Sequence, residues 1–344
     1  MKAALITGQE QLELLDFEQT RPIPSGVVVD IAYCGICGTD VASYHTGHLH
    51  SPAVCGHEWT GTVSAIGSEV RHPAEGDRVV IGVCPPCGRC ETCVAGQPET
   101  CLVVQKQVRG RDSTAPPHGG FAPAIGVAAD RVVLAHPDLG DEDAAQVEPA
   151  AVAYHAVRRS GIGLGDVAVA QGAGPIGLLT LQLARAAGAT TVVVVEPTEH
   201  RRAKAVELGA HHAVEPGGKA TEIVSELTSG RRADVVYECA GIASLLQTAV
   251  DLTRRGGVMA MLGYVAGDSS INAGQWLSKD IRVVASMGFA HEDVHHTMSL
   301  IADGRVRVEP LHTRTIGLAE LDAVIADLAA GRADDTKVLV DPRR

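Results

Sequence analysis

The chain has 344 residues, 45% of them apolar, and a mean hydropathy of +0.11. This length exceeds that of one ordinary core, so we expect two domains. The net charge of −12, from 29 basic and 41 acidic residues, argues against nucleic-acid binding, which depends on clustered Lys and Arg. The longest aliphatic run, around Val192–Val195, is far shorter than the roughly 20 residues of a membrane helix, so no membrane partner is expected. The first residues, MKAALITGQE, lack the long apolar run of a signal peptide, which predicts a cytoplasmic protein.

The first part of the chain, to about residue 135, is rich in glycine, short apolar runs and turn signals. These features are typical of short strands joined by tight turns. We therefore expect a compact β-rich domain with a cysteine-rich loop inserted in it. The expected strands are Val27–Tyr33, Gly61–Ile66, Asp77–Gly82 and Asp130–Ala135.

Five cysteines lie between positions 84 and 101, and four of them have the spacing Cys87-x-x-Cys90-x-x-Cys93-x7-Cys101. Thiolates at two-residue spacing can converge on one point, and a tetrahedral Zn²⁺ takes four such ligands. The alternative, a disulfide lobe, needs an oxidising compartment. The spacing therefore predicts a closed structural zinc site in a lobe of about residues 84–102, with Cys84 as a spare thiol.

From Asp143 the pattern changes to alanine-rich helical stretches that alternate with short buried strands. Continuous apolar strands that alternate with helices indicate a parallel, doubly wound sheet, so the fold class is α/β. The expected strands are Val167–Gln171, Thr191–Glu196, Val235–Cys239, Gly257–Leu262 and Ile281–Ser286, and the expected helices are Gly177–Ala187, Glu199–Leu208 and Leu245–Leu252. The helices His291–Asp303 and Leu318–Gly331 then precede a strand, Lys337–Val340, that could return to the first domain.

A glycine motif, Gly172-x-Gly174-x-x-Gly177 with Pro175 and Ile176 inside it, follows an apolar strand and opens a helix. Dinucleotide binding requires this context. The first glycine permits a tight turn, the second lets the backbone approach a pyrophosphate, and the third allows close helix packing. The pyrophosphate then lies at the positive end of the helix. The alternative is a merely structural glycine turn.

Glu196 ends the second strand of this region and can accept hydrogen bonds from both ribose hydroxyls of adenosine. Its charge repels a 2′-phosphate, so we expect NAD in preference to NADP. Arg201 and Arg202 follow closely, and as cofactor contacts they could soften this preference. The alternative is that both lie on the solvated face of the next helix.

A second group of ligand-type residues is spread along the chain. It comprises Cys37 in YCGICGTD, His57 and Glu58 in CGHEWTG, and Glu148 in VEPAAVAYHAV. Three protein ligands and a water make the open zinc site that catalysis needs. Each residue taken singly is more often structural than a ligand. Beside a dinucleotide motif, the set predicts a catalytic zinc, and hence two zinc ions per chain.

These segments together resemble the zinc-dependent medium-chain dehydrogenase/reductases, the alcohol dehydrogenase superfamily, over essentially the whole chain. The resemblance is carried by CGICGTD, GHEWTG, CGRCETCVAGQPETC, VEPAAVAYHAV, and GAGPIG followed by Glu196. It implies a GroES-like catalytic domain at residues 1–151 and 286–344, and a Rossmann domain at residues 152–285. It also implies that Cys37, His57 and Glu148 bind the catalytic zinc, with Glu58 binding directly or through water. Glu148 stands where the alcohol dehydrogenase branch has cysteine, as in the polyol (sorbitol, butanediol) branch.

One departure concerns proton transfer. The family often has a relay histidine five residues after the catalytic cysteine, and here that position is Ala42. The residues His45, His48 and His50 follow soon after and could replace it. The alternative is that these histidines only line the surface or a pocket.

The resemblance implies hydride transfer between NAD(H) and an alcohol carbon, with zinc as the Lewis acid that lowers the pKa of the hydroxyl. Thr39 is then placed to take the hydroxyl proton, and Asp40 to hold a ligand or the backbone. We expect a small secondary alcohol, diol, polyol or cyclitol as substrate, and a homodimer or homotetramer. Threonine dehydrogenase-like oxidation, or oxidation of an aminocyclitol or amino sugar, is the enzymatic alternative. A zinc-lobed dinucleotide sensor is the non-enzymatic one.

Overall fold

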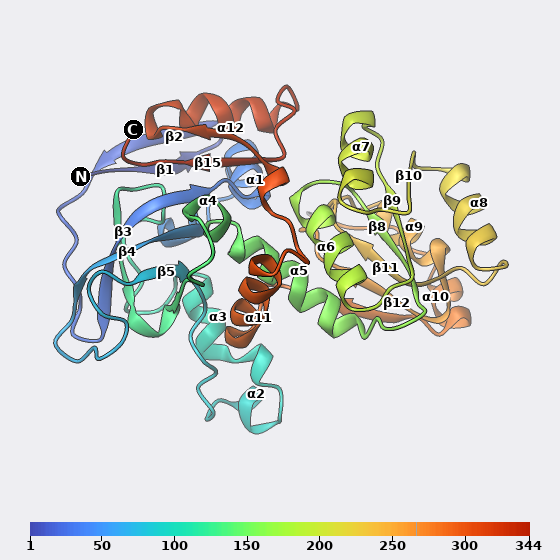
Figure 1. The fold of residues 1–344 in the computed structure, drawn as a ribbon, viewed down its shortest axis with the longest axis horizontal. Coiled ribbons are helices and arrows are strands. Elements are labelled where there is room, and N and C mark those ends of the chain that lie inside the picture. The colour runs from blue at the N-terminus through green and yellow to red at the C-terminus, as the bar shows by residue number, and fades with distance from the viewer. Residues whose placement is uncertain (266) are drawn as a thin grey trace. The chain divides into compact units, whose positions relative to one another are not determined.

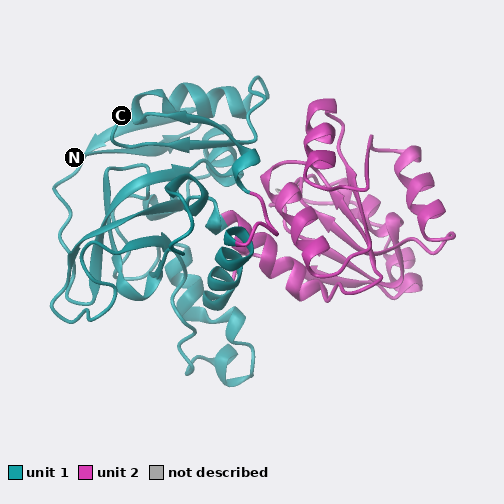
Figure 2. Cartoon of the chain, in the orientation of Figure 1, with its two compact units in different colours: residues 1–148, 290–302, 308–344 teal, residues 149–289, 303–307 magenta. Residues whose placement is uncertain are grey.

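The computed structural model describes residues 1–265 and 267–344, and the chain forms two compact units (Figure 2). Unit 1 contains Met1–Glu148, Ala290–Ala302 and Val308–Arg344, and unit 2 contains Pro149–Phe289 and Asp303–Arg307. A compact unit is not proof of an independently folding domain, so the domain limits given above stay a prediction. In the part of the chain that the structure describes, every helix is too short or too polar to span a lipid bilayer.

Unit 1 is built on a seven-stranded sheet ordered β14-β15-β3-β4-β5-β7, with β6 paired to β3. Figure 1 labels its strands β3, β4, β5 and β15. The strands are β3 (Gly26–Gly35), β4 (Glu58–Ile66), β5 (Arg78–Ile81), β6 (Ala124–Ala128), β7 (Val132–Leu134), β14 (His312–Ile316) and β15 (Lys337–Val340). Apolar side chains of this sheet form one core with Phe121, which is itself fully buried. The expected β-rich domain is therefore confirmed.

The C-terminal strand does return to this sheet. β15 pairs antiparallel with β3, so that Leu339 lies opposite Gly35 and Val340 opposite Cys34. Ile36, which follows β3, donates its N–H to the carbonyl of Val338 at 3.0 Å. This register brings Lys337, at the start of β15, next to the segment that leads from β3 into the following helix.

A hairpin of β1 (Lys2–Gly8) and β2 (Gln11–Asp16) adds Ala4 to the same core. It was not expected from the sequence, because most side chains of β2 are exposed and its pattern does not alternate clearly. The helices of unit 1 are α1 (Gly38–Thr46), α2 (Glu91–Val94), α3 (Leu102–Val108), α4 (Asp141–Ala144), α11 (His291–Ala302) and α12 (Leu321–Ala329). The helix α5 (Val147–Ser160) begins in unit 1 and continues in unit 2.

Unit 2 is a six-stranded parallel sheet ordered β10-β9-β8-β11-β12-β13. Its strands are β8 (Val167–Gln171), β9 (Thr191–Val195), β10 (His212–Val214), β11 (Ala233–Glu238), β12 (Thr253–Met261) and β13 (Arg282–Ala285). The helices α6 (Pro175–Ala186), α7 (Glu199–Glu207), α8 (Gly218–Leu227), α9 (Leu245–Leu252) and α10 (Ala273–Lys279) connect them. Counted within the unit, the order 3-2-1-4-5-6 is that of the dinucleotide-binding doubly wound fold, whose ligands bind beyond the carboxyl ends of the strands at the switch between β8 and β11. The predicted sheet is confirmed, although β10, α8 and α10 were not foreseen.

Candidate active site and metal centres

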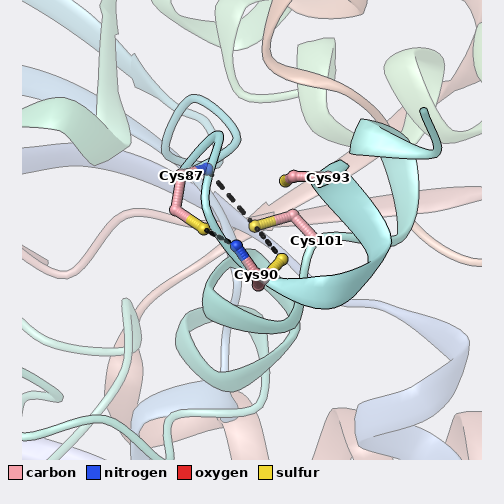
Figure 3. Close-up of side chains that lie close together, drawn as sticks. All are labelled: Cys87, Cys90, Cys93 and Cys101. Carbon is pink, nitrogen blue, oxygen red and sulfur yellow. Dashed lines mark hydrogen bonds between the residues drawn. The ribbon is translucent and has the colours of Figure 1, made fainter. Parts of the chain in front are cut away.

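The four cysteines of the lobe come together (Figure 3). The sulfur atoms of Cys87, Cys90, Cys93 and Cys101 all lie within 4.8 Å of one another, and all nine cysteines of the chain are free thiols. Short helical turns hold them: Cys90 precedes α2, Cys93 lies within it, and Cys101 precedes α3. Cys84 is 2% exposed and stands outside this group.

Hydrogen bonds inside the lobe favour the thiolate form of Cys90 and Cys101, whereas burial and its sulfur neighbours raise the pKa of Cys93. The N–H of Cys87 donates to Cys101 Sγ at 3.4 Å, and the N–H of Cys90 donates to Cys87 Sγ at 3.3 Å. The hydroxyl of Thr92 and nearby backbone groups lower the pKa of Cys90 to about 5. Burial opposes ionisation of Cys101, but backbone donors still lower its pKa. Four converging sulfurs, some of them poised to ionise, match the donor set of a tetrahedral zinc.

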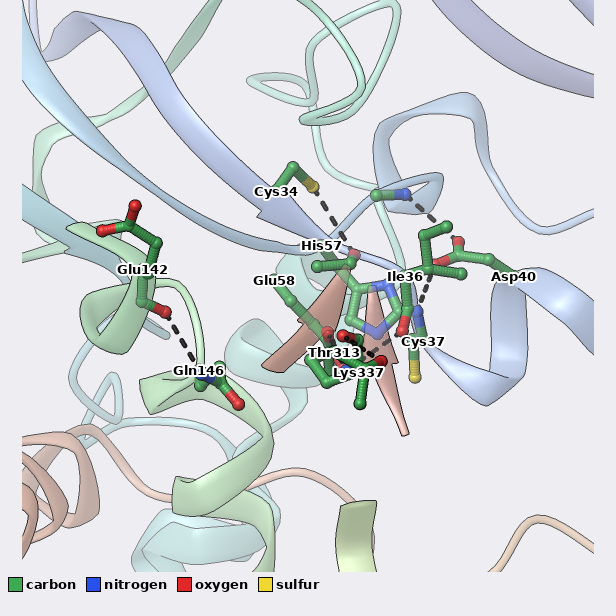
Figure 4. Close-up of polar contacts among 12 residues, drawn as sticks. Cys34, Ile36, Cys37, Asp40, His57, Glu58, Glu142, Gln146, Thr313 and Lys337 are labelled. Carbon is green, nitrogen blue, oxygen red and sulfur yellow. Dashed lines mark hydrogen bonds and ion pairs between the residues drawn. The ribbon is translucent and has the colours of Figure 1, made fainter. Parts of the chain in front are cut away.

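A second group of ligand atoms forms in unit 1 (Figure 4). Side-chain ligand atoms of Cys37, His57 and Glu58 lie within 4.8 Å of one another. Cys37 is the N-cap of α1, and His57 directly precedes β4, which begins at Glu58. The antiparallel register of β3 and β4, with Gly35 opposite Glu58, brings these two segments together.

His57 is oriented for metal binding. Its Nδ1 lies 3.0 Å from the carbonyl oxygen of Val54. A carbonyl can only accept a hydrogen bond, so Nδ1 carries the proton and Nε2 is left to bind a cation. Burial lowers the pKa of His57, but Cys37, Asp40 and Glu148 raise it by more, to well above its ordinary value. The anionic surroundings that attract a proton there also attract a divalent cation.

Asp40 links the two segments that carry the ligands. Its carboxylate accepts the N–H of Cys37 at 3.0 Å and the N–H of Gly56 at 3.1 Å, and the residue is 3% exposed. Burial raises the pKa of Asp40, and the neighbouring His57 counteracts this rise. Both carboxylate oxygens are thus used to hold backbone, which is the supporting role expected for this residue.

Lys337 belongs to the site although sequence reasoning did not find it. Its Nζ lies 2.5 Å from Glu58 Oε2 and donates to the carbonyl of Ile36 at 3.0 Å, and both side chains of the ion pair are 2% exposed. Burial lowers the pKa of Lys337, but Glu58 and Cys37 raise it above its ordinary value, so the side chain is a cation. Glu58 therefore has a charged partner already, and any metal must compete with Lys337 for it. The available signal was a lysine that opens the otherwise apolar strand KVLV.

Glu148 lies in the first turn of α5, outside the close group of three. Burial raises its pKa to about 7; His57 and Lys337 oppose the rise, and Glu58 adds to it. These interactions put Glu148 within electrostatic reach of the ligands without placing it among them. Its role as a third zinc ligand stays a prediction.

Thr39 lies in the first turn of α1, directly after Gly38. Its Oγ1 is buried, and no residue that the structure describes forms a hydrogen bond with it. Thr39 also lines a cavity of about 290 Å³ within unit 1, together with Ser43 and His50. A buried hydroxyl that lacks a partner is costly unless a ligand supplies one, so this group is available to a substrate.

In unit 2 the glycine motif has the geometry that a dinucleotide needs. Gly172 has a φ of 98°, which favours glycine in the turn after β8. Gly174 caps α6 and has open space where a Cβ would lie, whereas a Cβ on Gly177 would lie 2.0 Å from the carbonyl oxygen of Gly172. Pro175 and Ile176 form the first turn of α6, whose free N–H groups can receive a phosphate.

Glu196, 4% exposed, directly follows β9 instead of ending it, and is held by the loops around it. Its carboxylate accepts the N–H of Ala173 at 2.8 Å and the N–H of Thr198 at 3.0 Å. Each oxygen keeps a lone pair for a ribose hydroxyl. Arg202 does not lie on a solvated helix face. Its side chain is 17% exposed, contacts Glu215 at 3.2 Å and donates to the carbonyl of Glu196 at 2.9 Å. Arg201 is half-buried beside it.

Comparison with known proteins identifies the family of this chain. A family model for an alcohol dehydrogenase GroES-like domain matches residues 24–138, and one for a zinc-binding dehydrogenase matches residues 175–303. A sorbitol dehydrogenase of Halalkalibacterium halodurans is 31% identical over 350 residues, which cover 99% of each chain. The chain belongs to the zinc-dependent medium-chain dehydrogenase/reductase family. It is an oxidoreductase that acts on a CH–OH group, so the comparisons favour the enzymatic interpretation over the sensor.

Two further members of this dehydrogenase family are instructive. A 2-dehydro-3-deoxy-L-galactonate 5-dehydrogenase of Pseudoalteromonas atlantica is 30% identical and covers 99% of this chain and 98% of its own. A zinc-binding dehydrogenase from Sinorhizobium meliloti, solved with bound NADP, has a TM-score of 0.86 at 33% identity and covers 99% of each chain. The family's zinc ions and nicotinamide cofactor fit the residues present here: four sulfurs, a sulfur–imidazole–carboxylate group, and an open glycine loop at a helix N-terminus.

Proposed function

We propose that this dehydrogenase interconverts a secondary alcohol of a small polyol, diol or cyclitol and the corresponding ketone. One observation supports this most. A thiol, an imidazole and a carboxylate converge in unit 1. The hydroxyl of Thr39, which has no hydrogen-bond partner within residues 1–265 and 267–344, lies two residues from the thiol, on the wall of a cavity. Cys37, His57 and either Glu58 or Glu148 hold the zinc, and Cys87, Cys90, Cys93 and Cys101 hold the structural one. A zinc ion held there supplies Lewis acidity, which lowers the pKa of the substrate hydroxyl.

Side chains of the protein have the remaining roles in the reaction. Thr39 accepts the hydroxyl proton, since its oxygen has no hydrogen-bond partner among the described residues. Asp40 fixes the backbone on both sides of the ligands, and His57 presents Nε2 because Val54 holds its Nδ1. Lys337 neutralises the charge of Glu58, so that Glu148 can serve as the anionic ligand of the zinc.

A polar substrate fits the lining of the cavity. Thr39, Ser43, His50 and Ser51 supply hydroxyl and imidazole groups beside apolar side chains. A site that pairs a second hydroxyl rejects analogues without one, because its own polar groups are then left unpaired. Two relatives named for a polyol and a sugar acid support the same substrate class. NAD is the expected cofactor because of Glu196, although the relative solved with NADP makes the choice worth measuring.

The test is a panel of alcohols followed by cofactor reduction at 340 nm. We expect higher kcat/KM for 2,3-butanediol, sorbitol, a cyclitol or threonine than for 1-butanol or benzyl alcohol. Glu148→Gln should lose turnover and catalytic metal while the lobe keeps its zinc. Preference for the simple primary alcohols would refute the polyol assignment. Full turnover of the variant at normal metal content would remove Glu148 from the site.

Assembly and location complete this proposal. We expect a homodimer or homotetramer in the cytoplasm, with a small molecule as the binding partner. Light scattering of the purified, zinc-loaded protein measures the assembly directly. A monomer at all micromolar concentrations would overturn the expected assembly while leaving the chemistry unaffected.

A further inference from the structure

We propose that α11 carries a third metal site of this chain, at which His291 and His295 bind an exchangeable divalent ion such as Zn²⁺. The two histidines open and close the segment HEDVH at the start of the helix. This is the H-E-x-x-H spacing, in which two histidines on one face of a helix bind zinc. The site lies within unit 1 and does not depend on whether the protein oxidises an alcohol.

Packing fixes the rotation of α11 about its axis. Asp293 is fully buried and Met298 is 3% exposed. The carboxylate of Asp293 accepts the N–H of Ala290 at 2.7 Å, which anchors the first turn. With this face turned inward, His291 lies half-buried at its edge, and His295 is exposed one turn further along the helix. An ion can therefore reach the pair from solvent.

The rings of His291 and His295 are already neighbours. Their centroids lie 5.8 Å apart, and their planes meet at 71°. Residues four apart on a helix have Cβ atoms about 5–6 Å apart. Rotation of the two side chains can thus bring one nitrogen of each ring onto a single ion, with the helix backbone unchanged.

A backbone carbonyl orients His291. Its Nδ1 lies 2.7 Å from the carbonyl oxygen of Val83, which lies just beyond β5 in the same unit. A carbonyl can only accept a hydrogen bond, so Nδ1 carries the proton and the lone pair of Nε2 is left for a cation. Metal-bound histidines usually donate their other N–H in this way. Val54 orients His57 by the same kind of contact in the Cys37 site.

The charges beside the pair favour a cation. Asp130 is exposed and interacts electrostatically with His291. The backbone holds it nearby, because the N–H of Gly82 donates to the carbonyl of Arg131 at 2.7 Å. Asp112 is a second carboxylate in this group, against the single guanidinium of Arg131. Asp112, Asp130 and Arg131 together therefore carry a net negative charge.

The donor set defines the class of ion. Within residues 1–265 and 267–344, neither histidine belongs to a group of three ligand-type side chains that lie within 4.8 Å of one another. Two imidazoles leave the other coordination positions to water, so the ion exchanges with solvent. Imidazole suits Zn²⁺, Ni²⁺ and Cu²⁺, whereas Mg²⁺ and Ca²⁺ prefer oxygen ligands. Catalytic zinc sites have three protein ligands, so this pair is a binding site and not a second active site.

The test measures additional zinc binding to the zinc-loaded protein by equilibrium dialysis at micromolar free Zn²⁺. We expect the parent to bind one ion more than His291→Gln or His295→Gln. The double variant should lose no more than either single variant, because one ion needs both rings. His296→Gln, a substitution on another face of α11, is the matched control and should equal the parent. The comparison cancels zinc bound elsewhere, for example at His48 and His50, whose rings lie 5.6 Å apart.

Thermal unfolding gives a second readout. An ion that binds only the folded protein raises its Tm, so added zinc should raise the Tm of the parent more than that of His295→Gln. Without added zinc the two should agree, because His295 is exposed. Equal zinc binding by the parent and both single variants would overturn the site. Loss of the ion from only one single variant would overturn the shared binding by two rings. An equal loss in His296→Gln would mean adventitious binding by surface histidines only.

Discussion

The cysteine lobe and the Cys37 site both bring metal-ligand atoms together, but the chain assembles them differently. In the lobe, Cys87 and Cys101 are 14 residues apart, and short helical turns between them complete the site. In the other site, Glu58 meets Lys337 across 279 residues, and the pairing of β15 with β3 brings them together. A locally encoded site can be closed and rigid, whereas one assembled from distant strands can leave an open position for chemistry.

The largest expected effect tests whether the lobe is a closed zinc site. A structural zinc contributes on the order of 10 kcal/mol to folding in small metal-binding peptides. Cys101→Ser removes a fully buried ligand and should lower the metal content from about two ions per chain to about one. The variant should also unfold at a lower temperature than the parent. Metal analysis and calorimetry measure both. Cys84→Ser is the matched control and should keep both ions. Loss of an ion from this control would show that the ligand set is misassigned.

The next effect concerns the open character of the Cys37 site. Thr39→Val removes the hydroxyl that lines the cavity and keeps the shape of the side chain. Groups that transfer protons typically contribute 10²- to 10⁴-fold, so kcat should fall by about that factor while both metals remain. Steady-state kinetics and metal analysis measure the two quantities. Unchanged kcat and an unchanged pH profile would exclude Thr39 from the relay.

Substitution of Lys337 tests how much β15, which is distant in sequence from Glu58, contributes to the stability of the protein. Lys337→Met leaves Glu58 buried without its partner, and breaking a buried ion pair in this way typically costs about 3–5 kcal/mol. Urea unfolding of the metal-stripped protein should show a loss of that order. Glu58→Gln combined with Lys337→Met should recover much of it, since no buried charge is then left alone. Equal stability of the single variant and the parent would mean that water reaches Glu58.

The smallest expected effect concerns the glycine loop, which is as local as the lobe but depends on Glu196, the residue after the next strand. A hydrogen bond to a charged group contributes roughly 1.5–3 kcal/mol, which corresponds to about a 10- to 150-fold preference for NAD over NADP. Glu196→Ala should narrow this preference. The ratio of kcat/KM for the two cofactors measures it. Equal efficiency with both cofactors in the parent would argue against this role of Glu196.

The sequence was informative where the chemistry is local. Spacing alone predicted the four lobe cysteines, and a strand–glycine–helix pattern predicted Gly172, Gly174 and Gly177, because neighbouring residues can converge without tertiary structure. The parallel sheet of unit 2 also followed from its apolar runs. Residue type beside the dinucleotide motif grouped Cys37 with His57, and the resemblance to a known family implied the same ligands.

Other features depend on long-range packing and could not be found in this way. The partner of Glu58 is fixed by strand register, which a lysine in KVLV does not encode by itself. The cavity lined by Thr39 and His50 exists only when β1, α1 and the loop before β4 meet. The residue type of Glu148 suggested a zinc ligand. In the structure its side chain lies outside the close group of Cys37, His57 and Glu58, although it interacts electrostatically with His57 and Glu58.

The insertion of unit 2 within unit 1 has a consequence for synthesis on the ribosome. Lys337 is made 279 residues after Glu58, which at 5–20 residues per second corresponds to roughly 15–55 s. During this interval the nascent chain has Cys37, His57 and Glu58 but lacks the strand that neutralises the glutamate. All of the Pro149–Phe289 segment of unit 2 emerges before that strand does. The order of translation therefore allows the nucleotide-binding part to fold first, and the metal site of unit 1 reaches its final charge balance last.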